Sequence, residues 1–394
     1  MTYLNFCHRG YEYFADTYPE GSSSCPFLCP ERGVFREVDY EEAIGEVSLL
    51  LNQADKPLVY GLSRAGCKAQ ELALQLADRL ACNIRSDISP YWEGFFDLAG
   101  QKGLLWPTLD DIRDNADVVI LWGDDLYQSH PRLLARYAVF PRGKYIERGH
   151  KDRTVILLAD HESDLKKIAN QFVTLEKGCF DSAFRSMAKL VAEEEVTEEQ
   201  QDIIRLRIIA KTIRNAKYAV MFFPIKNLEE SNGAILQSLY ALSRNLNRQT
   251  RFSLFPLDLG SNYMGAIQTM LRHKGHPFDG SIKTPSGDEQ GLTGMDPLDE
   301  DHDVILLVSP DYDNGSLTSL LEKNQKSDIL LVDRYCPSSL KDRVRVMIPS
   351  ALPGAGSDEV AYRMDGLPVV LPALLSTDAP SQAEVIQDIR RRII

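Results

Sequence analysis

The chain has 394 residues, which is enough for two or three domains of ordinary size. Its 57 acidic residues outnumber its 44 Lys and Arg residues, and the net charge of -13 argues against general nucleic-acid binding. No apolar run approaches the roughly 20 residues of a membrane-spanning helix, and the first residues lack the basic-then-apolar pattern of a secretion signal. Seven scattered cysteines lack the spacing of a disulfide framework. We therefore expect a soluble, cytoplasmic protein without nucleic-acid or membrane partners.

Short apolar runs alternate with helical segments along the chain. The runs cover residues 57–61, 116–123, 153–160, 217–224, 302–310 and 327–333. Several are followed by segments whose apolar residues recur every three or four positions, as in 67–82 and 232–246. Continuous apolar strands separated by helices are typical of parallel sheets that are covered on both faces. The pattern predicts an α/β fold with at least two parallel sheets flanked by helices.

The same pattern suggests a division into domains. We expect an N-terminal segment over 1–54, an α/β domain over 55–195, a second α/β domain over 196–350 and a C-terminal segment over 351–394 that returns to the core. Residues 274–301 are rich in Gly, Pro and Asp, which is typical of a surface loop. Loops of that length are uncommon unless they serve a function or contact a partner.

Two closely spaced cysteines stand near the N-terminus, in "GSSSCPFLCPERG" (21–33). Closely spaced thiolates such as Cys-x-x-Cys-x-x-x-Cys can hold an iron–sulfur cluster, and Cys25 and Cys29 match the last two positions of that run. The first position is Ser22, whose hydroxyl is a far poorer ligand for iron. From these residues alone, either two unrelated cysteines or a degenerate cluster loop would explain the stretch.

Motifs for hydrolysis or nucleotide binding are missing. The sequence has no G-x-S-x-G elbow, no P-loop and no G-x-G-x-x-G turn opening a helix. Among seven histidines only His273 and His276 are close together, and a surface pair explains them better than a metal site. Ser129 and His130 are not expected to form a catalytic pair, because the side chains of neighbouring residues diverge.

Three segments taken together resemble the B subunit of formylmethanofuran dehydrogenase, of the molybdopterin oxidoreductase superfamily. They are "YGLSRAGCKAQELALQLAD" (60–78), the stretch from "ADVVILWG" to "DRTVILLAD" (116–160) and "VAYRMDGLPVVL" (360–371). Their order and spacing agree with the family from the N-terminal cysteines to about residue 372. The resemblance implies α/β domains around a cleft that holds tungsten or molybdenum on two pterin guanine dinucleotides, beside a four-iron cluster.

The resemblance also implies the positions of the cluster ligands. They fall on Ser22, Cys25, Cys29 and Cys67. Three thiolates and a serine could hold a cluster in principle, but a degenerate loop that holds none is the expectation.

The other positions of the redox site depart further from the family. The metal-ligating cysteine falls on Trp92, or on Tyr91 after a slip of one residue, and neither an indole nor a phenol suits this metal. Asp124 and Asp125 replace a neutral turn beside the pterin dinucleotide and would repel its phosphates. We therefore expect that the redox centre is lost and that the chain holds no metal.

With its redox residues lost, the chain resembles the B subunit of the formyltransferase/hydrolase complex of aerobic methylotrophic bacteria, which lacks the metal chemistry of the dehydrogenase. That resemblance implies a non-catalytic scaffold that assembles with subunits A, C and D. The complex would move a formyl group from tetrahydromethanopterin to a methanofuran-like carrier, methylofuran, and hydrolyse it to formate. Two alternatives stay open: a redox-active tungsten or molybdenum subunit with an unusual ligand set, and a free-standing pterin- or nucleotide-binding α/β protein.

The basic stretch 132–153 has seven Lys and Arg residues against two acids. It is either a solvated loop that pairs with acids elsewhere, or a binding surface for the glutamate-rich tail of the carrier. Guanidinium groups bind carboxylates bidentately, which suits the second interpretation. The candidate carrier-binding residues are Arg132, Arg142, Lys144 and Arg148. The resemblance implies that the corresponding loop of the dehydrogenase relatives lies near the pterin phosphates.

Overall fold

The computed structural model describes residues 2–4, 13–15, 39–88, 91–102, 106–123, 126–130, 132–196, 202–231, 234–258, 261–275, 300–312 and 315–394. These form two compact units. Unit 1 comprises Met1–Ile88 with Leu259–Ile394, and unit 2 comprises Ser89–Asp258. In the described ranges, no helix is both long enough and apolar enough to cross a membrane.

Unit 1 is built on a five-stranded parallel sheet with the strand order β12-β11-β10-β3-β4. The strands are β3 (Pro57–Gly61), β4 (Asn83–Ser86), β10 (Val304–Val308), β11 (Asp328–Asp333) and β12 (Val344–Pro349). The predictions at 57–61, 302–310 and 327–333 are confirmed as strands. The sheet joins two strands from early in the chain to three from its last third. The chain therefore leaves this sheet after β4 and returns only after unit 2 is complete.

This order explains why the units differ from the domains expected from the sequence. A division into 55–195 and 196–350 assumes that each sheet is made of consecutive strands. Here β3 pairs with β10, so the first two strands of the expected first domain belong to a sheet with strands from beyond residue 300. The C-terminal segment 351–394 does lie in unit 1, together with β3.

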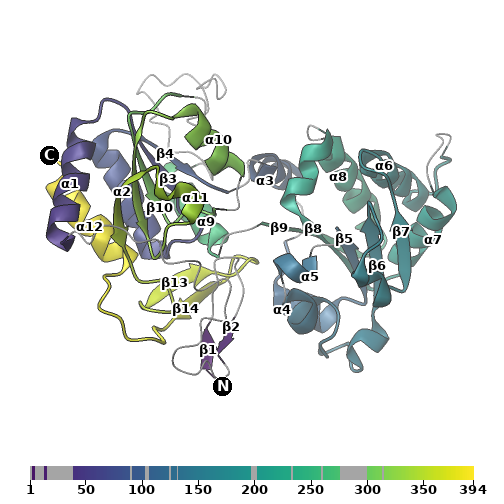
Figure 1. Ribbon diagram of the computed structural model, residues 1–394. Coiled ribbons are helices and arrows are strands. Elements are labelled where there is room, and N and C mark those ends of the chain that lie inside the picture. The colour runs from purple at the N-terminus through teal and green to yellow at the C-terminus, as the bar shows by residue number, and fades with distance from the viewer. Residues whose placement is uncertain are drawn as a thin grey trace. The chain divides into compact units, whose positions relative to one another are not determined.

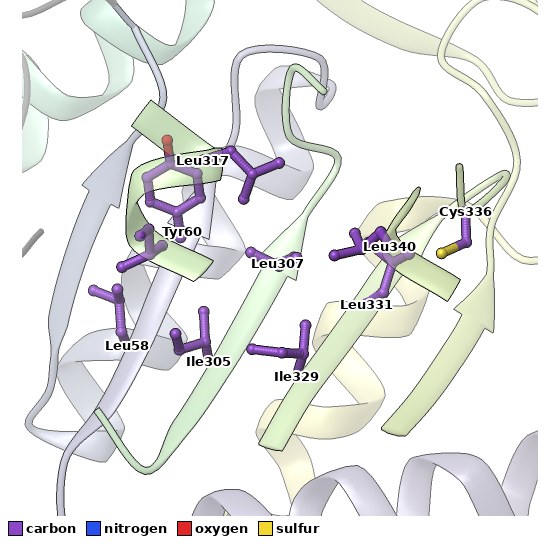
Figure 2. Close-up of a cluster of buried hydrophobic side chains, with 10 residues drawn as sticks. Leu58, Tyr60, Ile305, Leu307, Leu317, Ile329, Leu331, Cys336 and Leu340 are labelled. Carbon is purple, nitrogen blue, oxygen red and sulfur yellow. The ribbon is translucent and has the colours of Figure 1, made fainter. Parts of the chain in front are cut away.

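Helices lie on both faces of this sheet (Figure 1). On one face, Leu58, Ile305 and Ile329 are in register, as are Tyr60, Leu307 and Leu331 on the same three strands. Figure 2 shows these rows with Leu317 of α10 (Gly315–Lys323) and Leu340 of α11 (Ser338–Lys341). The other helices of the unit are α1 (Tyr40–Gln53), α2 (Cys67–Leu80), α9 (Tyr263–Lys274) and α12 (Gln382–Arg392). Of these, α12 packs against both α1 and α2, and all three helices contact the sheet.

Unit 1 also contains two short antiparallel ribbons. One pairs β1 (Thr2–Leu4) with β2 (Tyr13–Ala15), and the other pairs β13 (Glu359–Tyr362) with β14 (Pro368–Leu371). The second ribbon packs against α2 and α9.

Unit 2 has a second five-stranded parallel sheet, in the order β7-β6-β5-β8-β9. Its strands are β5 (Val118–Trp122), β6 (Thr154–Ala159), β7 (Gln171–Thr174), β8 (Tyr218–Pro224) and β9 (Arg251–Leu257). Its helices are α3 (Tyr91–Lys102), α4 (Leu109–Asn115), α5 (Leu126–Ser129), α6 (Phe180–Val191), α7 (Ile203–Arg214) and α8 (Ala234–Leu246). A π-helical turn, η1 (Leu134–Ala138), and the 3-10 turns η2 (Gly149–Asp152), η3 (Asp164–Lys167) and η4 (Ile225–Ser231) complete it. The predicted parallel sheets flanked by helices are thus confirmed.

Both sheets reverse their strand order at one point. In unit 1 the chain winds outward in opposite directions from β3 and β10, and in unit 2 from β5 and β8. In open α/β sheets, ligands bind outside the carboxyl ends of the strands at such a switch point. The carboxyl edges of the two sheets are therefore the places where functional residues are expected.

Candidate functional site

The backbone at the switch point of unit 1 has an unusual conformation. At the end of β3, Gly61 has φ +115° and Leu62 has φ +85°, and just beyond β10 Ser309 has φ +40°. A Cβ on Gly61 would lie 2.6 Å from the carbonyl oxygen of Val308, so the two strands approach each other closely there. Non-glycine residues with positive φ are strained, and such strain concentrates at ligand sites and active sites. The loops at the carboxyl edge of unit 1 therefore contain strained backbone, which the surrounding structure must stabilise.

A buried carboxylate organises this edge. Asp87 follows β4 and accepts hydrogen bonds from the backbone N–H of Ser63 at 2.9 Å, from its hydroxyl at 2.8 Å and from the backbone N–H of Asp311 at 2.5 Å. Burial raises the pKa of Asp87. These bonds tie the loops after β3, β4 and β10 together.

A buried arginine, Arg64, sits next to Ser63 in the loop after β3. Nη1 of Arg64 donates to the carbonyl oxygen of Pro310 at 3.0 Å and pairs with Asp333 at 3.3 Å. Its guanidinium lies 5.4 Å from the ring centroids of both Tyr312 and Tyr335, a cation–π arrangement. The hydroxyl of Tyr312 also donates to Asp333 at 2.9 Å, and burial raises the pKa of that carboxyl. The charge of Arg64 is therefore balanced within the protein.

The composition of this edge does not fit the pyrophosphate of a pterin dinucleotide. Three buried carboxylates, those of Asp87, Asp311 and Asp333, stand at or just beyond the ends of three of its strands. Phosphate sites instead use unopposed cations and free backbone N–H groups. None of these carboxylates was predicted as a site residue, although Asp311 and Asp333 stand at or just after the ends of apolar runs in the sequence.

Cys67, the expected fourth cluster ligand, begins α2. Its half-buried Sγ lies 3.6 Å from Nδ2 of Asn262, and burial is the main cause that raises the pKa of the thiol. Ser22, Cys25 and Cys29, the other expected ligands, lie outside the described residues.

Glu359 of β13 lies against the N-terminus of the same helix. A Cβ on Gly66, the residue before α2, would meet Cδ of Glu359 at 2.3 Å, so glycine is required for this approach. The carboxylate accepts the backbone N–H groups of Lys68 and Val360, while burial raises its pKa to about 6. The helix end that carries Cys67 is therefore capped by a carboxylate.

Trp92 lies in α3 of unit 2 and is fully buried. Its Nε1–H donates to Asp258, just beyond β9, at 2.7 Å. The indole stacks on Phe96 at 5.4 Å and lies 5.9 Å from Phe95 and from Trp106. An indole has no lone pair for a metal. If position 92 is the ligand position, as the resemblance implies, the residue present does not fit a tungsten or molybdenum centre.

Possible metal ligands can be assessed only where the structure describes the chain. Across the ranges that the structure describes, no three His, Cys, Asp or Glu side chains are grouped so that they could hold a metal ion. His273 lies 3.9 Å from Glu71 of α2. His276 lies outside the described residues, so the predicted surface pair of His273 and His276 stays a prediction. Asp124 and Asp125 are not described either.

One local expectation is wrong. The side chains of Ser129 and His130 do not diverge, because Nδ1 of His130 lies 3.1 Å from Oγ of Ser129. The turn after α5 brings the two neighbours together.

The basic stretch is a shaped loop on the amino side of the unit 2 sheet. It leads into β6, and the N–H of Tyr145 bonds to the carbonyl of Asp114, which precedes β5. Buried Arg153 donates to the carbonyls of Ala116 at 3.1 Å and Val139 at 3.2 Å, and also bonds those of Pro141 and Arg113. Arg153 is thus structural, and burial lowers its pKa to about 10.

The four candidate carrier-binding residues belong to two different connections of unit 2. Arg142, Lys144 and Arg148 are exposed in this loop, and Arg148 pairs with Asp152 at 2.6 Å. Arg132 instead lies in the connection between α5 and η1, nearer in sequence to the carboxyl end of β5. The loop therefore offers three of the four as an anion-binding surface on the edge opposite the switch point.

The fold and these edges define an α/β protein with two doubly wound parallel sheets, and its relatives can be named. The chain is 28% identical over 344 residues to the B subunit of the tungsten-containing formylmethanofuran dehydrogenase 2 of Methanocaldococcus jannaschii, covering 86% of this chain and 79% of that protein. The corresponding subunit of Methanococcus maripaludis is 28% identical over 372 residues, covering 91% and 85%. No protein-family model matches.

A solved structure shares the fold. A chain of the formyltransferase/hydrolase complex of Methylorubrum extorquens, crystallised with methylofuran, superimposes with a TM-score of 0.70 at 18% identity, covering 91% of this chain and 96% of that chain. The predicted resemblance to the B subunit of formylmethanofuran dehydrogenase is therefore confirmed in sequence, and the resemblance to the formyltransferase/hydrolase complex is confirmed in fold.

Proposed function

We propose that this chain is a non-catalytic subunit of a cytoplasmic formyltransferase/hydrolase complex, in which it supports subunits A, C and D. The complex would convert formyl-tetrahydromethanopterin to formate through a formylated methanofuran-like carrier. Two similarities support this: sequence relatives that are dehydrogenase B subunits, and a fold shared with a chain of a complex that carries out formyl transfer and hydrolysis. The carrier in that structure is methylofuran.

The observation that carries the proposal is the environment of Trp92. A fully buried indole, hydrogen-bonded to Asp258 and packed among aromatic rings, stands where the resemblance expects a metal-ligating side chain. A redox subunit would need a ligand there, whereas a scaffold needs only a packed core. The carboxylate-rich switch point of unit 1 supports the same conclusion, because it opposes pyrophosphate binding.

A second candidate is a redox-active tungsten or molybdenum dehydrogenase subunit. The specific observation in its favour is that both sequence relatives are tungsten-containing enzymes. It would require a ligand other than position 92.

Purification of the native complex separates the two candidates. We expect stoichiometric co-purification of formyltransferase and hydrolase subunits, formyl transfer to the carrier, and neither metal nor pterin dinucleotide by elemental and mass analysis. Near-stoichiometric tungsten or molybdenum would overturn the scaffold assignment in favour of the dehydrogenase. A lone, stable chain that captures none of the subunits would overturn both.

Carrier binding is the second part of the proposal. We assign it to the exposed residues Arg142, Lys144 and Arg148, with Arg132 as a separate contact, and the ligand is a tail of glutamate carboxylates. Binding of a synthetic glutamate oligomer to the complex should weaken with rising salt and on replacing the three loop residues by Ala. Assembly should be unchanged. Unaltered affinity of the triple variant at low salt would contradict the assignment, and the Arg132→Ala variant tests the fourth residue by itself.

A further inference from the structure

Exposed apolar side chains are concentrated in and beside the β13–β14 ribbon of unit 1, with Leu367 in its turn and Leu375 just beyond β14. Four large apolar residues within 16 positions are exposed: Val360 at 39%, Leu367 at 40%, Val370 at 74% and Leu375 at 62%. The same ribbon spans 360–371, a segment that carries the sequence resemblance but has no part in the proposed chemistry. Its exposed face needs an explanation.

The two faces of the ribbon differ sharply. Ala361 and Leu371 are each 1% exposed and lie on the packed face, where β13 contacts α2 and α9 and the Leu371 side chain lies near Gly354. Val360 and Val370 are cross-strand partners on the opposite face. Side chains on one face of adjacent strands act together, so the valine pair forms a continuous apolar surface. A two-stranded ribbon is marginal unless it is packed, and here only one face is.

Hydrogen bonds within the described part of unit 1 hold the ribbon in shape. The side-chain oxygen of Asn262 accepts the backbone N–H of Tyr362 at 2.7 Å. In the turn, the backbone N–H of Arg363 donates a hydrogen bond to the carbonyl oxygen of Leu367 at 2.8 Å. The guanidinium of Arg363 donates two hydrogen bonds to the buried carboxylate of Asp365. A surface fixed in advance loses little conformational entropy on binding.

Among the described residues, no strand other than β13 pairs with β14, so its outer edge is open there. In an antiparallel ribbon, hydrogen-bonded and non-hydrogen-bonded residue pairs alternate. The backbone N–H of Arg363 bonds to the carbonyl of Leu367, so this pair is a hydrogen-bonded one. Counting along the register from there, Val360–Val370 is a non-hydrogen-bonded pair. The N–H and C=O of Val370 therefore point away from β13. Pro368 stands at another non-bonded position, where its missing N–H costs nothing. The outer edge of β13 differs, because Asn262 and Glu359 accept its N–H groups.

We propose that the exposed face of this ribbon and the outer edge of β14 bind an extended apolar segment of a partner subunit, which adds a strand beside β14. The inference rests on the proposed hetero-oligomeric function. Edge strands with unsatisfied backbone groups are templates for strand addition, and the valine pair would give the added strand an apolar contact. Four large apolar side chains are far fewer than the roughly 20–30 residues per side of a stable interface. The surface thus suits one anchor of a larger heteromeric contact rather than a symmetric dimer.

Two variants test the face and the edge separately in the assembled complex. Val370→Asp places a charge on the apolar face, and Val370→Pro removes the outward N–H without breaking a bond inside the ribbon. Each should weaken capture of the partner subunit by tenfold or more, on the order of a binding hot spot. The matched control is Leu49→Asp, which charges another exposed apolar residue of unit 1, 54% exposed on α1, and should leave capture within about twofold. Circular dichroism confirms folding of all three.

A photo-crosslinker at position 370 identifies the occupant. Crosslinking to a subunit that co-purifies stoichiometrically with the wild-type chain supports the proposal. Crosslinking to a second copy of this chain, or to the chain's own N-terminal residues, overturns it. Wild-type assembly with unchanged capture by both Val370 variants overturns this inference alone, whereas failure of the wild-type chain to capture any subunit overturns the proposed function as well.

Discussion

The indole N–H of Trp92 donates a hydrogen bond to Asp258 at 2.7 Å, joining the start of α3 to the end of β9 inside unit 2. The contact gives a buried indole both packing and a partner for its polar atom. A residue that the sequence shows only as an aromatic in a helix is thus part of the core at the carboxyl edge of the sheet.

Replacing Trp92 by cysteine should destabilise unit 2 without creating a metal site. The cavity should lower the free energy of unfolding by about 3–5 kcal/mol, as for other large-to-small core changes. Chemical denaturation measures the loss, and elemental analysis of the Trp92→Cys complex should find no tungsten or molybdenum. The Trp92→Phe variant, which keeps most of the ring volume, should lose less. Equal losses in both variants would mean that the hydrogen bond, not the packing, dominates.

Glu359 should make stability depend on pH. Burial raises its pKa from 4.5 to about 6, so the folded state holds the proton more tightly than the unfolded state. The stabilisation is fully present below about pH 4.5 and is lost as the pH rises through about 6, and its size is about 2 kcal/mol. In the Glu359→Gln variant this dependence should vanish. The difference in unfolding free energy between the two proteins, measured from pH 4.5 to 7, checks it. A constant difference across that range would contradict the assignment.

Two arginines of the basic loop should behave in opposite ways. Arg153 satisfies several carbonyls in the interior, so Arg153→Met should leave them unpaired and lower the free energy of unfolding by about 2–4 kcal/mol. Arg142 is exposed, and Arg142→Ala should change stability by less than about 0.5 kcal/mol. Urea denaturation of both variants makes the comparison. Similar losses in the two would show that the loop is not anchored by Arg153.

Arg64 and Asp333 should be strongly coupled. Either single variant, Arg64→Met or Asp333→Asn, removes one partner of a buried ion pair and should cost roughly 3–5 kcal/mol. The double variant should cost clearly less than the sum, with a coupling energy of about 1–3 kcal/mol. A double-mutant cycle from denaturation curves gives this number. Additive losses would mean that the tyrosine rings and the Pro310 carbonyl, rather than Asp333, hold the guanidinium.

The sequence by itself determined the class of fold and several of its strands. Apolar runs such as 304–308 and 328–333 fix buried parallel strands, because a strand covered on both faces must be apolar at nearly every position. It also identified the relatives, since segments 60–78, 116–160 and 360–371 carry enough identity in the right order. Short, polar strands such as β4 were not predicted, because their polar residues leave no continuous apolar run.

Only the tertiary structure decided which distant segments meet. The pairing of β3 with β10, the hydrogen bond from Trp92 to Asp258 and the Arg64–Asp333 pair each join residues more than 100 positions apart. Local propensity contains no information about such contacts, because they form only when helices and sheets pack together. The sequence of the basic stretch likewise does not show which of its arginines is buried and which are exposed. Burial, and not composition, separates the structural Arg153 from the exposed Arg142.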